Sequence, residues 1–177
     1  MIENKARIAA NGGTIATSVL IYMALHDDDA LRFSTKRLNA ITDTVITYSE
    51  DINHSAEKFI LYRNRLDQCG IDFQLKYDFI RALMKGLKFS GKREHTGAEA
   101  GIEATYTLIL LAAHDIYGLG RTRLRRIQHR IKEYAWAIKD GAVHILEYMK
   151  CLACECGQKY QVLMNYENEY GEICIYG

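Results

Sequence analysis

The sequence contains no proline, the residue that most often ends or bends a helix, so long uninterrupted helices are permitted. It has no apolar run close to the roughly 18 residues that a membrane span requires, since the longest run, YTLILLAAHD, stops well short. The first residues have neither the hydrophobic region nor the cleavage site of a signal peptide. We therefore expect a cytoplasmic protein that does not enter a membrane.

Cysteine is present but does not form a recognisable framework. Five cysteines, an odd number without a secretion signal, indicate reduced thiols rather than disulfides. Four of them are candidates for a zinc site: Cys151, Cys154, Cys156 and Cys174. Three of these lie within an expected helix, and their C-x-x-C spacing is not on a knuckle, so core thiols are favoured over zinc.

Motifs of the common enzyme classes are also missing. There is no Walker-type phosphate loop and no G-x-S-x-G, and the tripeptide GLG alone is too weak to indicate a phosphate site. We predict that the protein is not an enzyme and uses no cofactor.

The 177 residues, of which 49% are hydrophobic and 25% charged, are typical of a single compact globular domain over 1–177. The formal net charge of +1 is unevenly distributed along the chain. Residues 71–140 carry 13 basic and 8 acidic side chains, whereas 141–177 carry 2 and 5. This asymmetry predicts a localised basic surface.

Two stretches of the chain resemble each other: LIYMALHDDDALRFSTKRL from residue 20 and LILLAAHDIYGLGRTRLRRI from residue 108. When they are aligned, eight of fifteen positions are identical between 13–27 and 101–115, and matches continue to a tyrosine at position 148. We therefore predict a mainly α fold in which a three-helix unit is duplicated in tandem, with repeats at 9–79 and 97–166. The two units would pack about a pseudo-two-fold axis, with Gly13 and Gly101 as points of close helix approach.

Apolar periodicity and capping residues predict where the helices lie. In the first repeat we expect helices over 14–27, 35–53 and 55–69. In the second, a capping box of Thr96 and Glu99 opens a helix that runs to His114, a helix starts near Thr122, and a third spans 142–156 and ends at Gly157.

The segments outside the repeats have other patterns. A linking helix and a basic loop, SGKREHTG, occupy 80–96. Residues alternate between apolar and polar from Tyr160 to Tyr166, before turn-forming residues, so a small β-hairpin is expected over 160–177. A similar alternation from Phe73 to Phe79 predicts partly extended backbone.

The two His-Asp pairs, His26-Asp27 and His114-Asp115, suggest either a metal or acid–base site or a structural corner. A metal site needs more converging ligands than either repeat offers at helical spacing. A histidine in the last turn of a helix interacts favourably with the helix dipole, and the aspartate could cap the next helix or pair with Arg37 or Arg123. We predict the structural role and no metal, and a metal-dependent enzyme is the third alternative for function.

The helix near 121–139 is the strongest candidate for a binding surface. Its predicted exposed face is far more basic than that of the equivalent helix in the first repeat, which has only Lys36 and Arg37. A basic surface could bind phosphates or an acidic protein, or it could simply be solvated. The candidate partner-binding residues are Arg121, Arg123, Arg125, Arg126, Arg130 and Lys132, with Lys88, Lys92 and Arg93.

The stretch AAHDIYGLGRTRLRRI resembles the pattern A-L-H-D-x-F-G-F-G-x-x-R-L-x-R-F of short, uncharacterised proteins encoded by phages and prophages of Firmicutes. The first repeat departs from that pattern, with DDDALRF in place of the glycine turn. The resemblance implies a mobile-element origin, and phage proteins of this size include inhibitors of bacterial immunity such as anti-CRISPR proteins.

The expected function is therefore binding to a bacterial defence system, such as an RNA-guided nuclease or its nucleic acid, in the host cytoplasm. The alternative is a DNA-binding regulator or an accessory factor of replication or recombination, and the sequence leaves homo-oligomerisation open.

Overall fold

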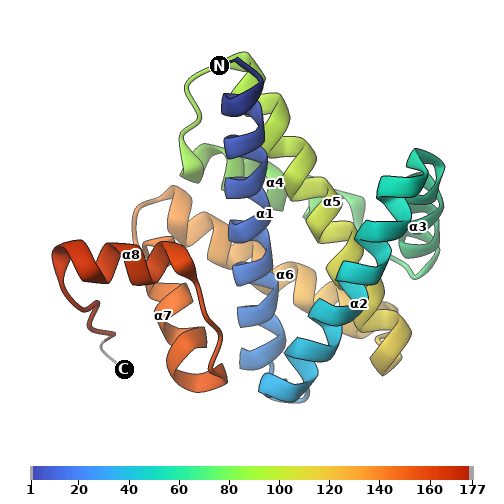
Figure 1. Ribbon diagram of the computed structural model, residues 1–177. Helices are drawn as coiled ribbons and strands as arrows, with labels where there is room; N and C mark the ends of the chain where they lie inside the picture. The colour runs from blue at the N-terminus through green and yellow to red at the C-terminus, as the bar shows by residue number, and fades with distance from the viewer. Residues whose placement is uncertain (1, 176–177) are drawn as a thin grey trace.

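The computed structural model describes residues 2–175, which form eight α-helices and no strand (Figure 1). The mainly α prediction is thus confirmed for this part of the chain. The helices are α1 (Ile2–Asp27), α2 (Thr35–His54), α3 (Ala56–Gln68), α4 (Phe73–Leu87), α5 (Lys92–Tyr117), α6 (Arg121–Lys139), α7 (Ile145–Cys156) and α8 (Gln161–Tyr170).

Helices α1 and α5, each of 26 residues, pack against each other along the centre of the molecule. Their close approach involves three glycines: Gly13, Gly97 and Gly101. A Cβ atom added at Gly13 would lie 2.6 Å from the carbonyl oxygen of Ala98, and one added at Gly101 would collide with the carbonyl oxygen of Ala10. The prediction that Gly13 and Gly101 mark close helix contacts is confirmed.

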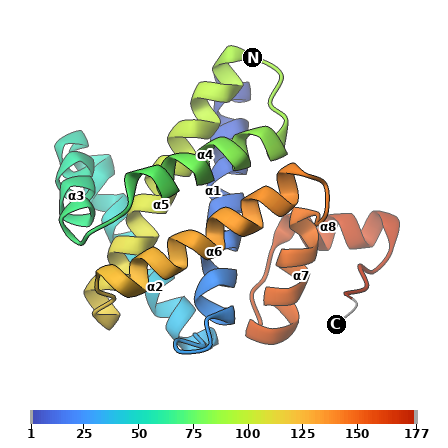
Figure 2. The same cartoon turned by 180° about the vertical axis from the view of Figure 1, so that it is seen from behind.

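The remaining helices are distributed around this pair in a reciprocal way. Helices α2 and α3, which follow α1 in the chain, pack on α5, whereas α6 and α7, which follow α5, pack on α1. Helix α4 lies side by side with α6 and covers the back of the molecule (Figure 2). Each half of the chain therefore buries its apolar surface against the first helix of the other half.

Helix α1 is long and apolar enough to cross a membrane by length and composition alone, with a mean hydropathy of 1.5 over its most apolar window. In the structure, however, 61% of that window is buried inside the protein. A core helix that is apolar on most sides has the same composition, and the burial against α5 accounts for it.

The predicted C-terminal hairpin is wrong, because Gln161–Tyr170 forms helix α8 and residues 171–175 form no regular element. Two of the alternating residues, Val162 and Met164, are about half exposed, and the buried residue of this helix is Leu163, which lies outside the alternation. Lys150 of α7 forms ion pairs with Glu167 and Glu172, which hold the C-terminal segment against that helix.

Two further predictions are corrected. Residues 73–79 are the first two turns of α4 rather than extended backbone, since Asp72 caps the helix by accepting a hydrogen bond from the Leu75 amide. The capping box at Thr96 is also wrong, because α5 already begins at Lys92 and the Thr96 hydroxyl donates to the Lys92 carbonyl inside the helix. The predicted basic loop is accordingly shorter than expected.

The other helices agree with the sequence-based ranges to within a few residues, apart from α1, which extends further toward the N-terminus than expected. Helix α7 begins three residues later than predicted, where His144 and Glu147 form a capping box. It ends as expected at Gly157, whose φ of 61° is in the left-handed region that glycine adopts without strain.

Candidate functional site

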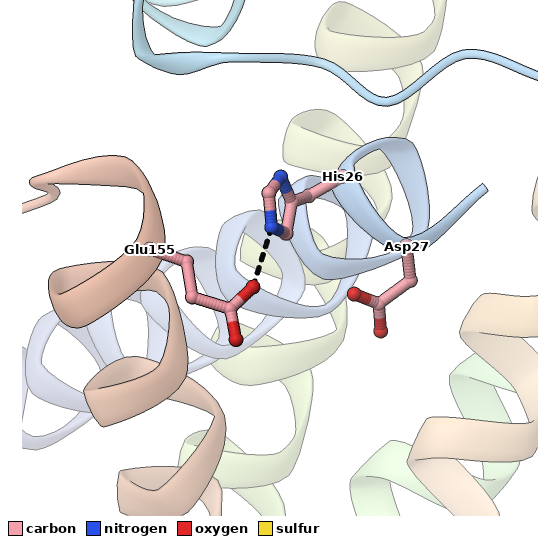
Figure 3. Close-up of side chains that lie close together, drawn as sticks. All are labelled: His26, Asp27 and Glu155. Carbon is pink, nitrogen blue, oxygen red and sulfur yellow. Dashed lines mark hydrogen bonds and ion pairs between the residues drawn. The ribbon is translucent and has the colours of Figure 1, made fainter. Parts of the chain in front are cut away.

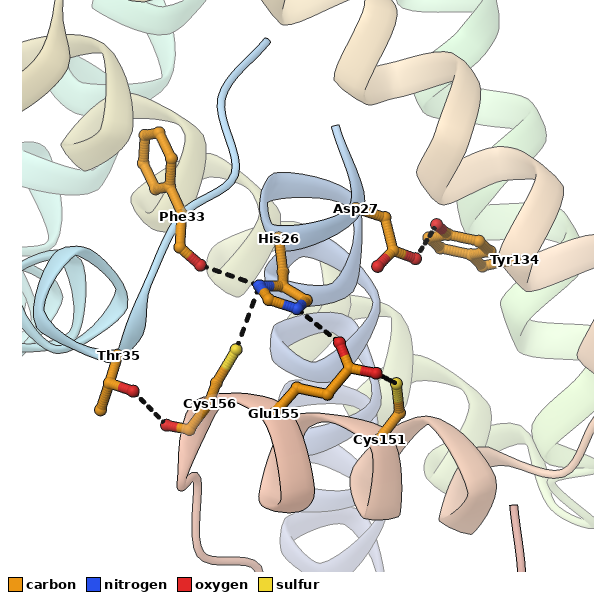
Figure 4. A network of polar contacts seen from close by, with 8 residues as sticks. All are labelled: His26, Asp27, Phe33, Thr35, Tyr134, Cys151, Glu155 and Cys156. Atoms are coloured by element: carbon orange, nitrogen blue, oxygen red, sulfur yellow. Dashed lines mark hydrogen bonds and ion pairs between the residues drawn. The ribbon is translucent and has the colours of Figure 1, made fainter. Parts of the chain in front are cut away.

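The C-terminal end of α1 carries the first His-Asp pair (Figure 4). The Nδ1 atom of His26 lies 3.0 Å from the carbonyl oxygen of Phe33, and because a carbonyl only accepts, Nδ1 must carry the proton. The opposite ring nitrogen, Nε2, lies 2.6 Å from a carboxylate oxygen of Glu155 on α7. The fold thus brings a second carboxylate to His26 and Asp27, which sequence reasoning did not foresee.

Burial by itself would lower the pKa of His26, but the hydrogen bonds to the Phe33 carbonyl and to Glu155 outweigh burial and raise the pKa above its usual value. The hydrogen bond from His26, together with one from Cys151, lowers the pKa of Glu155. The two side chains therefore favour an imidazolium–carboxylate pair when no other ligand is present. Glu155 remains 53% exposed, so this pair faces solvent on one side.

Thiol and hydroxyl groups surround this pair. Cys151 donates to Glu155 over 3.4 Å, and burial with the adjacent carboxylate raises the pKa of this thiol to about 12. The sulfur of Cys156 lies 3.2 Å from Nδ1 of His26, while Cys154 is exposed. On the other side, the Tyr134 hydroxyl donates to Asp27 over 2.7 Å. These three thiols have different surroundings, and Cys151 is held protonated rather than as a nucleophilic thiolate.

The second His-Asp pair, at the end of α5, repeats part of this arrangement. Nδ1 of His114 lies 2.9 Å from the Leu119 carbonyl, and the Tyr48 hydroxyl donates to Asp115 over 2.5 Å. In place of a second carboxylate, Arg65 of α3 donates two hydrogen bonds to Asp115, at 2.8 and 3.0 Å. The Asp115 carboxylate at this corner is therefore neutralised by a cation of the protein itself.

The predicted partners of the two aspartates are therefore corrected. Neither Asp27 nor Asp115 pairs with Arg37 or Arg123 in the structure; their partners are a tyrosine and, for Asp115, Arg65 as well. Arg37 instead donates to the Leu31 carbonyl. The histidines lie in the last turn of α1 and of α5, as expected.

Three of the predicted partner-binding residues on α6 have contacts within the protein. Arg126 forms an ion pair with Asp28, whose side chain is only 2% exposed. Arg130 is oriented toward Tyr134, and Arg121 packs against Gly70. Arg123 and Arg125 are exposed, and Lys132 is half-buried.

The predicted residues outside α6 lie apart from these arginines. Lys88 lines a hollow with Ile138 and Lys139 at the C-terminal end of α6, and Lys92 and Arg93 lie beyond it in the first turn of α5. The α4–α5 connection is at the opposite end of α6 from Arg121 (Figure 2). The proposed set of basic residues is therefore split along the length of the molecule.

The structure places another set of cations together, on adjacent sides of α4 and α6. A hollow of about 130 Å³ is lined by Arg81, Lys85, Trp136 and Lys139, with Asp78 and Ala82. The Lys139 ammonium lies 3.8 Å from the centre of the Trp136 ring, and Trp136 is 46% exposed. Trp136, the single tryptophan of the sequence, lies outside the apolar stripe of α6, and this was the sequence signal that could have indicated the hollow.

A stripe along one side of α6 continues from the hollow. Arg125, His129, Lys132 and Trp136 recur at spacings of three and four residues and so lie on one side of the helix. We use the term basic face for this stripe together with the cations of the hollow: Arg81, Lys85, Arg125, His129, Lys132, Trp136 and Lys139.

Comparison with known proteins finds no matching family model, no similar curated protein and no similar solved structure.

Proposed function

We propose that the protein acts by binding a polyanionic partner through the basic face, without catalysing a reaction. The observation that carries this proposal is the hollow between α4 and α6, where Arg81, Lys85 and Lys139 line the space around Trp136 together with one carboxylate, Asp78. Lys139 also forms an ion pair with Asp140 beside the hollow. Cations beside an exposed aromatic ring match nucleic acid, because phosphates pair with the cations and a base stacks on the ring.

The partner class that we propose is a bacterial defence complex that contains nucleic acid, such as an RNA-guided nuclease. The basic face supports the nucleic-acid contact, and the resemblance of residues 112–127 to phage proteins supports the host-defence setting. In this proposal the protein occupies a groove that normally holds nucleic acid or contacts the nucleic acid directly. A DNA-binding regulator would use the same face, and would be distinguished by retaining its affinity for DNA without any host protein.

The test is binding of labelled single-stranded and double-stranded oligonucleotides over a series of salt concentrations. Replacing Arg125 and Lys132 with glutamine should reduce the affinity and decrease the slope of log K against log[salt] by about 0.7 to 0.9 for each lost phosphate contact. The matched control replaces Lys36 and Lys58, exposed cations on α2 and α3, and removes the same charge. Equal effects of the two pairs would indicate a non-specific charge effect and refute a role for the basic face.

A pull-down from bacterial lysate, with and without nuclease treatment, tests the partner class. Loss of the retained proteins after nuclease treatment supports contact through nucleic acid. If the double variant of Arg125 and Lys132 retains the same proteins as the parent, the basic face is not the site of binding.

We further infer that the two halves of the chain arose by internal duplication. Matching hydrogen bonds in the two halves support this inference. Tyr48 donates to Asp115, and Tyr134 donates to Asp27. Both histidines donate through Nδ1 to a carbonyl in the turn that follows. An experimental structure in which residues 13–62 do not superpose on 101–148 would count against the duplication.

A further inference from the structure

We infer that His26, Asp27 and Glu155 form a binding site for a divalent transition metal of the Zn²⁺ class. One ligand atom from each side chain lies within 4.8 Å of the other two. Figure 3 shows the imidazole ring directed toward the Glu155 carboxylate, with Asp27 at the same end of α1. One nitrogen and two carboxylate oxygens can occupy three positions around the ion, and water can occupy the fourth.

The histidine is already oriented as a metal ligand. Its Nδ1–H donates to the Phe33 carbonyl, which leaves Nε2 as the atom that faces Glu155. Histidines that bind metals commonly donate their other N–H to a backbone carbonyl or a carboxylate, because this fixes the ring and the tautomer. In the metal-free arrangement a proton lies between Nε2 and Glu155, and metal binding would release it to solvent.

The other His-Asp corner supplies an independent reason to expect a cation here. The Asp115 carboxylate is neutralised by the Arg65 guanidinium, 2.8 Å away. When Tyr62 and Leu66 are aligned with Tyr148 and Leu152, the residue at the position of Arg65 is Cys151. The first corner therefore has a cysteine where the second has an arginine, and it has an additional carboxylate, Glu155. Its hydrogen bond to Asp27 comes from Tyr134, a neutral phenol, and the nearby Arg130 interacts with Tyr134 instead of pairing with Asp27 as Arg65 pairs with Asp115.

Zinc binding requires the Glu155 oxygen to move slightly away from His26, and the Asp27 oxygen, which lies within 4.8 Å of both other ligand atoms, to move toward the ion. Zinc lies about 2.0 to 2.2 Å from nitrogen and oxygen ligands, so the 2.6 Å between Nε2 and the Glu155 oxygen must widen by less than about 1 Å. Glu155 is in the last turn of α7 and is 53% exposed, so its side chain is free to move by that amount. A nitrogen ligand favours zinc over Mg²⁺ or Ca²⁺, which prefer oxygen ligands throughout.

The experiment is calorimetric titration of the full chain with ZnCl₂ and, in parallel, MgCl₂. We expect one zinc ion to bind per chain, and Glu155→Gln to weaken zinc binding at least about tenfold, because the amide keeps the size of the side chain but loses its charge. Glu169→Gln, on exposed α8, is the matched control and should bind zinc like the parent. Equal zinc affinity in parent and Glu155→Gln, or no stoichiometric zinc binding by the parent, would overturn the proposal.

Thiols could bind zinc elsewhere, so a second pair of measurements locates the ion. Replacing the exposed Cys154 and Cys174 with serine should leave the zinc affinity unchanged. Anomalous diffraction at the zinc edge should place the ion between His26, Asp27 and Glu155. An ion located at Cys154 or Cys174, or loss of binding in the double serine variant, would contradict the proposed site.

Discussion

The two His-Asp corners of the molecule share the same hydrogen bonds but differ in the charged group beside the aspartate. At both corners a histidine donates to a following turn and a tyrosine from another helix donates to the aspartate. At the end of α5 the aspartate is neutralised by Arg65, whereas at the end of α1 a second carboxylate, Glu155, joins the pair. The hydrogen bonds are common to both corners, whereas the charged group beside the aspartate differs: Arg65 stabilises one corner, and Glu155 leaves the other with excess negative charge.

The largest expected effect comes from the helix crossing that positions both corners. Gly101→Ala should lower the free energy of unfolding by about 1–3 kcal/mol or more, because the new Cβ would collide with the backbone carbonyl of Ala10. Gly12→Ala, where no atom lies within 4 Å of the added Cβ, should leave stability unchanged or raise it by up to about 1 kcal/mol. Urea denaturation measures both. Equal stability of the two variants would show that α1 and α5 do not approach as closely as described.

The next largest effect concerns the turn that follows the first corner. Arg126→Gln should cost about 1.5–3 kcal/mol of unfolding free energy, because it leaves Asp28, 2% exposed, without its ionic partner. Arg125→Gln, one residue away on the exposed side of α6, should change stability by less than about 0.5 kcal/mol. Thermal denaturation of the two variants compares them directly. A neutral effect of Arg126→Gln would mean that Asp28 is hydrated rather than paired.

A smaller effect separates the two aspartates. Asp115→Asn should destabilise by about 0.5–1 kcal/mol, since it removes the ion pair with the partly exposed Arg65. Asp27→Asn should cost less, because the amide oxygen still accepts the hydrogen bond from Tyr134. High salt should reduce the difference, since it screens the exposed pair. If Asp27→Asn proves the more destabilising, Asp27 has a cationic partner in solution.

The smallest effect on stability at neutral pH concerns the ionisation of Tyr48 and Tyr134, which becomes measurable at alkaline pH. Burial, and then the bond to Asp115, raises the pKa of Tyr48 to about 12, and burial with the bond to Asp27 raises the pKa of Tyr134 further. A raised pKa in the folded state means that this stability is complete below pH 10 and is lost as the pH rises toward 12. Absorbance at 295 nm should show both ionising well above pH 10 in the parent. Ionisation of Tyr48 near pH 10 in the folded protein would contradict the hydrogen bond.

Much of the fold could be predicted from the sequence because most helices have strong local signals. The apolar spacing along α2, α3 and α6 and the glycine at position 157 placed these elements to within about three residues. Segments in which apolar residues alternate with polar ones were ambiguous. Helix α8 and the start of α4 contain alternating residues that fit a strand equally well until it is known which of them are buried.

The candidate sites were harder to predict because they depend on contacts between distant segments. His26 and Glu155 are 129 residues apart, and no local pattern relates them. Arg126 was predicted as a free surface cation, but the fold pairs it with Asp28, 98 residues away. The alignment of the two similar stretches of sequence did contain one usable signal, since it places Cys151 opposite Arg65 and so indicates that the corners differ.

The packing of α1 on α5 also affects how the nascent chain folds during translation. Helix α1 is apolar on most sides, and its main partner begins only at Lys92 and ends at Tyr117. At about 5–20 residues per second, the roughly 90 residues between the end of α1 and the end of α5 take about 5–18 s to translate. During that time the apolar surface of α1 lacks its partner and can bind chaperones or membranes. We therefore expect chaperones to bind nascent chains that end before residue 92.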